Sequence, residues 1–399
     1  MMDWNAFRAR FHLPDGVIYL DGNSLGPMPV AAPERVARTM DEWRDMLIGG
    51  WNDGAGGEGW MSWPGRLGDR IGRLIGAPAG SVTVGDTLSI KVFQALDAAL
   101  KMRPDRRVIL SDGGNFPSDL YMAEGLIGAL HRDLDLRVVA PEEVADTIDE
   151  DLAVLMLTQV DYRTGRMHDM ADLTARAHAA GALTVWDLAH SAGAHEVDLT
   201  GAGADFATGC TYKYLNAGPG APAFIYVRPN LQDAVEPALS GWLGHAAPFA
   251  FDPSYRPGAG VERLRVGTPA VLQMAALDAA LDIWDEVDMA ALRARSLELS
   301  ERFAAGVAAR CPALTPALAA GVPRGSQVSF RHADGYAIMQ ALIARGVVGD
   351  FRAPDILRFG FTPLFVSEAE VDGAVDHLAQ VMATAEWDQP RFRARRAVT

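Results

Sequence analysis

The sequence predicts an α/β protein with a large domain built on a mainly parallel sheet and a smaller α+β domain. Short apolar segments, such as 153–158 and 183–187, alternate with helical patterns through the middle of the chain. This rhythm is typical of parallel strands that are buried on both faces. After about residue 265 the pattern changes to long helices followed by separate strands. The length of 399 residues also exceeds one ordinary core, so we expect two domains.

The first elements follow from apolar residues spaced three and four apart. They predict a helix over 36–47 that ends at Gly49-Gly50, and a second helix over 67–75 that ends at Gly76. The elements that follow are a strand at 81–84, a helix through 92–100, a strand at 107–110, a helix whose first turn holds Pro117, and strands at 136–140, 153–158, 183–187 and 205–210.

The last third of the chain predicts the smaller domain. Its expected elements are helices at 270–286, 288–310 and 335–345, and strands at 326–330, 347–351 and 356–361. Ser367 and Glu370 form the capping-box pattern that begins the last helix. We therefore expect an N-terminal arm at 1–50 that packs with the small domain, a large domain at 51–268, and a small domain at 269–399.

Composition excludes several classes of protein. The 36 Lys and Arg against 51 Asp and Glu give a net charge of −15, which argues against nucleic-acid binding. No segment approaches the run of about 18 apolar residues that spans a membrane. The first residues lack the apolar core of a secretory signal. The basic cluster Arg391, Arg393, Arg395 and Arg396 is interpreted as a solvated tail.

The two cysteines predict a reducing compartment. Cys210 and Cys311 are too few for a disulfide framework, and both are interpreted as buried structural thiols. We therefore expect a cytoplasmic protein without a membrane partner. The nine histidines show no metal-ligand spacing, so no metal site is expected.

Lysine is rare in this sequence. All but three of the 36 basic residues are arginine, which either is a general compositional bias or marks the lysines as special. Lys213 lies in the apolar and aromatic segment 211–216, where partial desolvation favours the chemistry of a neutral amine. Lys91 and Lys101 flank a helix and are interpreted as solvated, although Lys91 also lies near a phosphate-like loop.

Polar and aromatic residues follow the strands at the edge where α/β sheets bind ligands. Segment 85–89 opens a helix with free N–H groups and suits an anion, although its hydroxyls could simply cap the helix. Phe116 is either a core anchor or a platform for a planar ring. Asp187 stands at the end of a buried strand, where a carboxylate is costly without a partner. It either pairs with a cation or caps the turn that follows. Together with Lys213, these features describe a site for pyridoxal 5′-phosphate.

At these residues the sequence resembles the kynureninase family within the fold-type I enzymes that use pyridoxal phosphate. The resemblance runs nearly end to end and includes segments 22–26, 115–119, 187–190, 211–216, 241–245 and 357–363. The Tyr-Lys-Tyr-Leu-Asn and Gly-Trp-Leu-Gly-His segments are the most specific of these. The family fold implies a seven-stranded, mainly parallel sheet in the large domain.

The resemblance also implies an activity. The family hydrolyses L-kynurenine to anthranilate and L-alanine in tryptophan degradation, and 3-hydroxykynurenine is left open as a second substrate. Segment 49–52 and Thr268 resemble the bacterial members, which favour kynurenine. The rival interpretations are an aminotransferase, a cysteine desulfurase, or a catalytically silent binding module with the same fold.

The resemblance assigns roles residue by residue. Lys213 binds the cofactor covalently, Asp187 pairs with its ring nitrogen, and Tyr212 is the acid or base near the substrate carbonyl. The implied substrate-binding residues are Arg358, Trp51 and Ser24, with Arg358 on the α-carboxylate. The implied cofactor-binding residues are Leu88, Ser89, Phe116, Pro117, Ser118, Asp119, Thr158, Asp187, His190, Tyr212, Lys213, Trp242 and Thr268. Trp242 and Thr268 come from the neighbouring subunit, which implies a homodimer with shared active sites.

Overall fold

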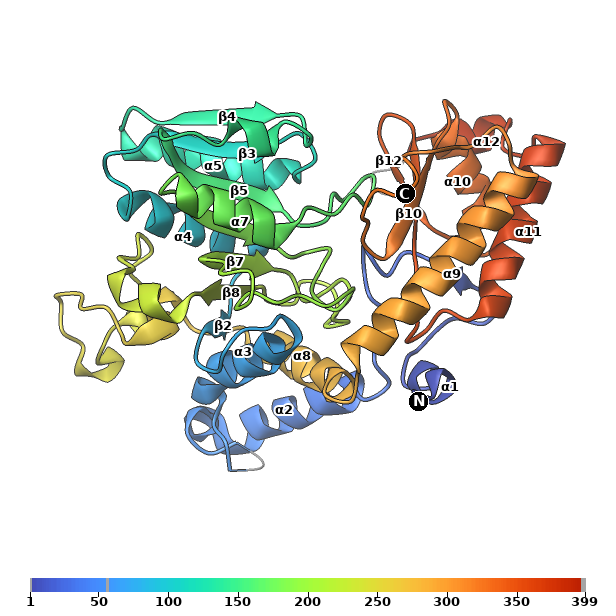
Figure 1. Cartoon of the computed structure of the whole chain (residues 1–399). Coiled ribbons are helices and arrows are strands. Elements are labelled where there is room, and N and C mark those ends of the chain that lie inside the picture. The colour runs from blue at the N-terminus through green and yellow to red at the C-terminus, as the bar shows by residue number, and fades with distance from the viewer. Residues whose placement is uncertain (1, 55–56, 396–399) are drawn as a thin grey trace.

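The large sheet has seven strands in the order β2-β8-β7-β6-β5-β3-β4 (Figure 1). The computed structural model describes residues 2–54 and 57–395. Strands β3 to β7 run parallel to one another, and β8 runs antiparallel to both β7 and β2. The predicted mainly parallel α/β sheet is confirmed. Its strands are Val82–Val84 (β2), Val108–Asp112 (β3), Asp135–Val139 (β4), Leu152–Thr158 (β5), Leu183–Asp187 (β6), Phe206–Gly209 (β7) and Phe224–Val227 (β8).

Two hydrophobic clusters cover the two faces of this sheet. In β3, Val108 and Leu110 belong to one cluster, and Ile109 between them belongs to the other. Alternate side chains of a strand point to opposite faces, so a strand covered on both faces is apolar throughout. The helices packed around the sheet are Leu88–Lys101 (α4), Pro117–Leu130 (α5), Val144–Thr147 (α6) and Met170–Ala179 (α7).

A second, antiparallel sheet lies in the C-terminal part of the chain, with the order β12-β13-β10-β9. Its strands are Thr315–Pro316 (β9), Gln327–Arg331 (β10), Asp350–Arg352 (β12) and Ile356–Gly360 (β13). The helices beside it are Met289–Arg310 (α9), Gly335–Ala344 (α10), Glu368–Thr384 (α11) and Pro390–Arg393 (α12). The predicted capping box is present, because Ser367 and Glu370 exchange both hydrogen bonds at the start of α11.

The N-terminal segment contacts both parts of the molecule. Strand β1 (Ile18–Tyr19) pairs in parallel with β11 (Val347–Val348) beside the small sheet. The helices that follow, α2 (Ala32–Met46) and α3 (Trp63–Leu74), pack on α8 (Val271–Trp284). The remaining short elements are α1 (Trp4–Arg8) and the 3-10 turns Leu47–Trp51 (η1), Trp60–Ser62 (η2), Pro229–Ala234 (η3), Trp242–Gly244 (η4), Pro248–Ala250 (η5) and Gly260–Leu264 (η6).

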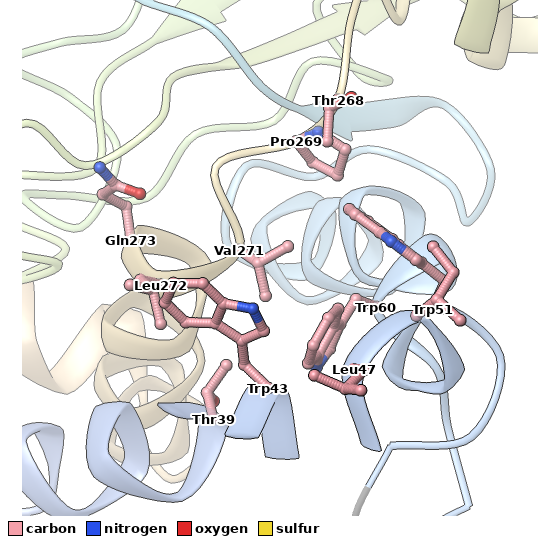
Figure 2. A pocket seen from close by; sticks show the side chains of 11 residues that line it. Thr39, Trp43, Leu47, Trp51, Trp60, Thr268, Pro269, Val271, Leu272 and Gln273 are labelled. Atoms are coloured by element: carbon pink, nitrogen blue, oxygen red, sulfur yellow. The ribbon is translucent and has the colours of Figure 1, made fainter. Parts of the chain in front are cut away.

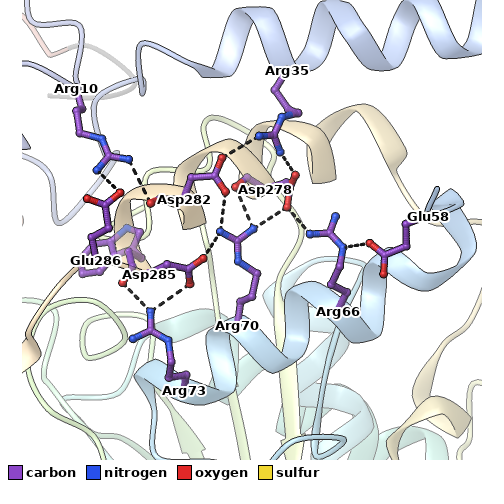
Figure 3. A network of polar contacts seen from close by, with 11 residues as sticks. Arg10, Arg35, Glu58, Arg66, Arg70, Arg73, Asp278, Asp282, Asp285 and Glu286 are labelled. Carbon is purple, nitrogen blue, oxygen red and sulfur yellow. Dashed lines mark hydrogen bonds and ion pairs between the residues drawn. The ribbon is translucent and has the colours of Figure 1, made fainter. Parts of the chain in front are cut away.

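A row of ion pairs joins α2 and α3 to α8 (Figure 3). Asp278, Asp282 and Asp285 lie on one face of α8 because they are spaced four and three residues apart. The buried Asp278 carboxylate accepts hydrogen bonds from Arg66 at 2.6 Å and from Arg70 at 2.7 Å, and it also pairs with Arg35 of α2. Arg70 reaches Asp282 and Asp285 as well, at 2.8 and 2.7 Å.

The apolar face predicted for the helix at 36–47 is not part of the core. The helix forms, but the side chains of Met40, Trp43 and Leu47 are 50%, 59% and 65% exposed. Helical periodicity shows only that apolar residues share a face, and here Trp43 and Leu47 on that face line an open cavity of about 430 Å³ instead of entering the core. Among the described residues, no helix combines the length and apolarity that a bilayer crossing requires.

One further expectation is wrong. Lys91 is not solvated but buried, and its ammonium pairs with Asp86 at 3.1 Å. The C-terminal Arg391, Arg393 and Arg395 are exposed to solvent as predicted, although Arg393 pairs with Asp334 and Asp388, and Arg395 stacks 4.6 Å from the ring centre of Tyr336. Arg396 lies outside the described residues. Lys101 is partly exposed, and Cys210 and Cys311 are buried free thiols, as predicted.

Candidate active site

The carboxyl ends of the parallel strands place most of the predicted site residues together. Lys213 follows β7, and its Nζ lies 3.0 Å from Nε2 of His190, which follows β6. The same Nζ lies 5.9 Å from the ring centre of Phe116 and 5.8 Å from that of Tyr212. The lysine therefore lies between two aromatic rings and an imidazole, as a site for a planar carbonyl compound requires.

His190 is neutral in this environment. Burial, followed by the charges of Lys213, Arg358 and Arg352, lowers the pKa of His190 well below its ordinary value. A neutral imidazole has one ring nitrogen free to accept a hydrogen bond. Nε2 can therefore accept from the Lys213 ammonium, so His190 can hold the lysine in place without competing with it for charge.

Two buried carboxylates lie beside the lysine. Oδ1 of Asp187 accepts a hydrogen bond from the Ala189 backbone N–H at 2.9 Å. Burial raises the pKa of Asp187 to about 6, although the Lys213 charge opposes this shift. Burial and the charge of Asp187 raise the pKa of Asp119 well above its usual range, and its Oδ2 has no hydrogen-bond partner among the described residues. A cationic ring nitrogen would relieve both carboxylates, which fits a protonated pyridine.

The beginnings of α4 and α5 meet at a place suited to a phosphate. The hydroxyls of Ser89 and Ser118, in the first turns of these helices, lie 2.9 Å apart. Thr87 before α4 makes no side-chain capping bond, so the first N–H groups of α4 remain available, whereas in α5 the Asp119 N–H already donates to the Phe116 carbonyl at 2.9 Å. Two helix N-termini with two hydroxyls attract an anion. The capping interpretation of segment 85–89 is therefore wrong for Thr87.

The remaining predicted cofactor residues form the wall of this site. Pro117 is the first residue of α5, and Phe116 before it is 43% exposed, so it is not a core anchor. The ring of Phe116 meets that of Tyr162 edge-on at 5.0 Å. Thr158 ends β5, where its buried hydroxyl donates to the Val160 carbonyl at 3.2 Å. Leu88 lines a cavity of about 350 Å³ together with Ser24 and Tyr212.

Tyr212 keeps its proton at neutral pH. Burial is the main reason that the pKa of Tyr212 is raised above its ordinary value, and the nearby Cys210 and Asp187 add to the shift. A protonated phenol is a hydrogen-bond donor, so Tyr212 is able to act as an acid.

Arg358 lies in a buried cluster on the small sheet. Its Nε lies 2.8 Å from Oδ1 of Asp350 and its Nη2 bonds the other oxygen, so the pair is bidentate. Nη2 also donates to Ser24 Oγ at 2.6 Å, and Arg352 donates to Asp350 Oδ2 at 2.7 Å. The fork of Arg358 is thus already ordered toward the site.

Asp350 is a site residue that the sequence analysis missed. It stands directly opposite Arg358 in the antiparallel pairing of β12 and β13. One sequence signal could have found this residue. Asp350 and Arg358 have opposite charges and lie on two short strands joined by a tight turn, where residues eight positions apart can pair across the strands.

Three predicted residues form a separate group. Trp51, Trp242 and Thr268 line a cavity of about 390 Å³, and Trp242 is 43% exposed. Trp51 and Thr268 also face the neighbouring cavity of about 430 Å³, where Trp51 stacks edge-on against Trp60 (Figure 2). Within one chain the structure places these residues in a different cavity from that of Ser24, Leu88 and Tyr212.

Sequence comparison with known proteins indicates a single family. Residues 292–378 match the family model described as the kynureninase C-terminal domain. The chain is 50% identical to a kynureninase of Pseudomonas fluorescens, and equally to one of Burkholderia pseudomallei (strain 1106a). Each match covers 98% of this chain and 95% of the relative.

Solved structures share the fold at lower identity. A cysteine desulfurase from Escherichia coli matches with a TM-score of 0.78 and 19% identity, over 96% of this chain and 99% of that one. A cystine C-S lyase in complex with its product cysteine persulfide matches with a TM-score of 0.76 and 18% identity, over 92% and 98% of the two chains. A mutant with glycine covalently linked to its pyridoxal phosphate cofactor matches with a TM-score of 0.81 and 17% identity, over 95% and 99%.

Proposed function

The chain belongs to the kynureninase family, and on this premise we propose how its residues hydrolyse L-kynurenine to anthranilate and L-alanine. The observation that carries the activity is the 50% identity to kynureninases over nearly the whole chain. The enzyme is a hydrolase that uses pyridoxal phosphate. When bound, this cofactor supplies an electron sink next to the substrate α-carbon, which makes the bond between Cβ and Cγ cleavable.

Lys213 is the residue that we propose to hold the cofactor and to move protons. Its Nζ lies beside His190 and between two rings, so both its position and its direction are restricted. A lysine can lose its proton and become a nucleophile, whereas an arginine cannot. Asp187 would pair with the ring nitrogen, with Asp119 nearby, and Phe116 would stack on the ring. The N-termini of α4 and α5, with Ser89 and Ser118, would hold the phosphate.

Tyr212 is the proposed acid at the substrate carbonyl. Because burial keeps its phenol protonated, it can donate to the oxygen on which negative charge develops when water adds to the γ-carbon. His190, whose Nε2 lies 3.0 Å from the amine, would hold Lys213 in place.

Arg358 is the proposed ligand of the substrate α-carboxylate, with Ser24 beside it. The guanidinium is held by Asp350, so its orientation exists before the substrate arrives. A preordered fork lowers the entropy that binding costs. Trp51, which lines the same cavity as Trp242 and Thr268, is proposed to contact the aromatic part of a substrate bound in the neighbouring subunit.

We propose that the active unit is a homodimer. In one chain Trp242 and Thr268 line a different cavity from that of Ser24, Leu88 and Tyr212, which supports their place in the site of a neighbouring subunit. The exposed apolar residues of α2 and η1 continue toward this region, and Ile48, Phe249 and Phe251 are 80%, 61% and 79% exposed. An apolar surface of this kind is typical of an interface.

The division into an arm at 1–50, a large domain at 51–268 and a small domain at 269–399 stays a proposal.

The cytoplasm is the proposed compartment, because both cysteines are free and buried. A cysteine desulfurase needs an accessible thiol, so the burial of Cys210 and Cys311 favours the hydrolase over this relative of the same fold.

Anthranilate fluorescence tests the proposal directly. Kynurenine and 3-hydroxykynurenine are offered side by side to the loaded enzyme, and we expect faster turnover of kynurenine. Lys213→Ala should abolish turnover and the visible absorbance that borohydride bleaches, whereas Lys101→Ala should retain both. Anthranilate release by Lys213→Ala at the wild-type rate would overturn the assignment of this lysine.

A further inference from the structure

The buried lysine that the sequence analysis misjudged has no role in the site described so far. Lys91 lies in the first turn of α4 and is 1% exposed. Its Nζ makes three contacts, to Asp86 Oδ2 at 3.1 Å, to Gln94 Oε1 at 3.0 Å and to the Leu264 carbonyl at 3.2 Å. An ammonium has three N–H groups, so Lys91 has one partner for each of them.

The first of these contacts fixes the loop that precedes Ser89. Asp86 has a left-handed backbone with φ of 55°, which is costly for a residue other than glycine. Its carbonyl accepts from the Ala223 backbone, and its carboxylate accepts from Lys91. The following residues, Thr87 to Ser89, carry the N–H groups and the hydroxyl that face the proposed phosphate. The position of these groups therefore depends on the contact between Lys91 and Asp86.

The third contact fixes a segment far away in the sequence. The Leu264 carbonyl accepts from both Lys91 and Gln94, the latter at 3.0 Å. Leu264 ends η6, and the chain continues through Val266 to Thr268. Gly241, next to Trp242, packs so closely on the Val266 backbone that a Cβ would lie 2.0 Å from its carbonyl oxygen. The Leu264 carbonyl thus fixes the segments of this chain that carry Trp242 and Thr268, the two residues proposed to act in the site of the neighbouring subunit.

We propose that Lys91 is a positioning residue that joins the phosphate loop of its own subunit to the segment that carries Trp242 and Thr268. This inference rests on the proposed phosphate site and goes beyond it, because Lys91 touches neither substrate nor cofactor. The Lys91 ammonium fixes the distance between the loop before Ser89 and the segment that carries Trp242 and Thr268. In a dimer, each phosphate site would combine this loop from one subunit with that segment from the other.

The chain contains a matched control at the other end of the same helix. Lys101 pairs with Asp97 at 2.9 Å and donates to the Glu236 carbonyl at 3.1 Å, so it makes the same kind of clamp without contact with the loop. Lys91→Met and Lys101→Met each remove an ammonium and keep the side-chain stem. Both apoproteins are titrated with pyridoxal phosphate and with pyridoxal, which lacks the phosphate, and their thermal unfolding is recorded.

We expect Lys91→Met to raise the Kd for pyridoxal phosphate about ten-fold or more, the loss typical of a charged hydrogen bond. Its Kd for pyridoxal should stay within about two-fold of wild type, and Lys101→Met should bind both compounds as wild type does. Equal Kd values for pyridoxal phosphate in the two variants would overturn the proposal. An equal loss for both compounds in Lys91→Met would also overturn it, because Lys91 would then support the whole site.

Asp86→Asn decides the matter if Lys91→Met does not fold. Asparagine tolerates the left-handed backbone of residue 86, so this variant removes the charge and keeps the turn. A weaker binding of pyridoxal phosphate with unchanged binding of pyridoxal supports the proposal, and unchanged binding of both overturns it. If wild type itself binds pyridoxal phosphate no better than pyridoxal, the proposed phosphate site fails, and the role of Lys91 fails with it.

Discussion

Asp350 and Arg358 face each other across β12 and β13, and Nε of the arginine lies 2.8 Å from Oδ1 of the aspartate. Both side chains are buried. A carboxylate that binds Arg358 therefore shares the guanidinium with Asp350 and does not meet a free cation. Asp350 therefore orients the Arg358 guanidinium and adds little net attraction for a substrate carboxylate. The attraction within a buried ion pair barely offsets the desolvation of its two charges.

Arg358→Lys is expected to raise KM for kynurenine about 10- to 100-fold with a smaller change in kcat, because a lysine cannot bond two carboxylates in one plane. Steady-state kinetics by anthranilate fluorescence measure both constants. Arg331→Lys is the matched control, since Arg331 lies on the adjacent strand and pairs with Asp355 at the surface. An unchanged KM in Arg358→Lys would remove this residue from carboxylate binding.

Tyr212→Phe is expected to lower kcat about 10²- to 10⁴-fold with KM nearly unchanged, because the phenol donates its proton only as charge develops on the substrate. The visible absorbance of the bound cofactor should stay as in wild type. Tyr121→Phe, at a side chain that is 63% exposed, should leave kcat unchanged. Wild-type kcat in Tyr212→Phe would assign the acid to another group.

Asp21→Asn is expected to change how the stability of the apoprotein depends on pH. Burial, followed by the charge of Asp350, raises the pKa of Asp21 to about 7. A raised pKa in the folded state means that the stability linked to protonated Asp21 is present below pH 4 and is lost as pH rises towards 7. The difference between the two proteins in free energy of unfolding should therefore move in favour of the variant between pH 5 and pH 8, by at most about 3 kcal/mol. Urea unfolding at both values measures it, and a difference that is independent of pH would contradict the raised pKa.

Asp278→Asn is expected to destabilise the fold by about 3 kcal/mol, because three arginines lose a buried carboxylate. Asp372→Asn breaks the exposed pair with Arg302 and should cost less than about 1 kcal/mol. Urea unfolding at low and high salt separates the two. The loss in Asp278→Asn should persist at high salt because burial limits screening, and an equal salt dependence of the two variants would show that the network is only a surface feature.

The position of the site could be predicted because it depends on local sequence. Thr158 and Asp187 are the last residues of buried strands, Lys213 comes shortly after β7, and the carboxyl ends of parallel strands meet at one edge of a sheet. The order of chemical types along the chain therefore predicts that the lysine, the aspartate and the aromatic ring lie together.

The environment of charged residues could not be predicted in the same way. Lys91 is buried by a carbonyl that is 173 residues away, and nothing in its own neighbourhood indicates that partner. The apolar side of α2 has the same periodicity as a buried helix, yet Trp43 is exposed in the single chain. Periodicity reports which residues share a face, whereas burial depends on what the whole fold places against that face.

The bond between Arg8 and Glu370 has a consequence for the order in which the protein forms during its synthesis. Arg8 donates to both carboxylate oxygens of Glu370, at 2.8 and 2.7 Å, across 362 residues of sequence. A ribosome that adds about 5 to 20 residues per second needs about 20 to 70 seconds to make the stretch between them. The first helix therefore leaves the ribosome long before its partner exists, while all strands of the central sheet are already complete when Glu370 is made. The contacts of the first 20 residues with β11 and α11 can therefore form only near the end of synthesis.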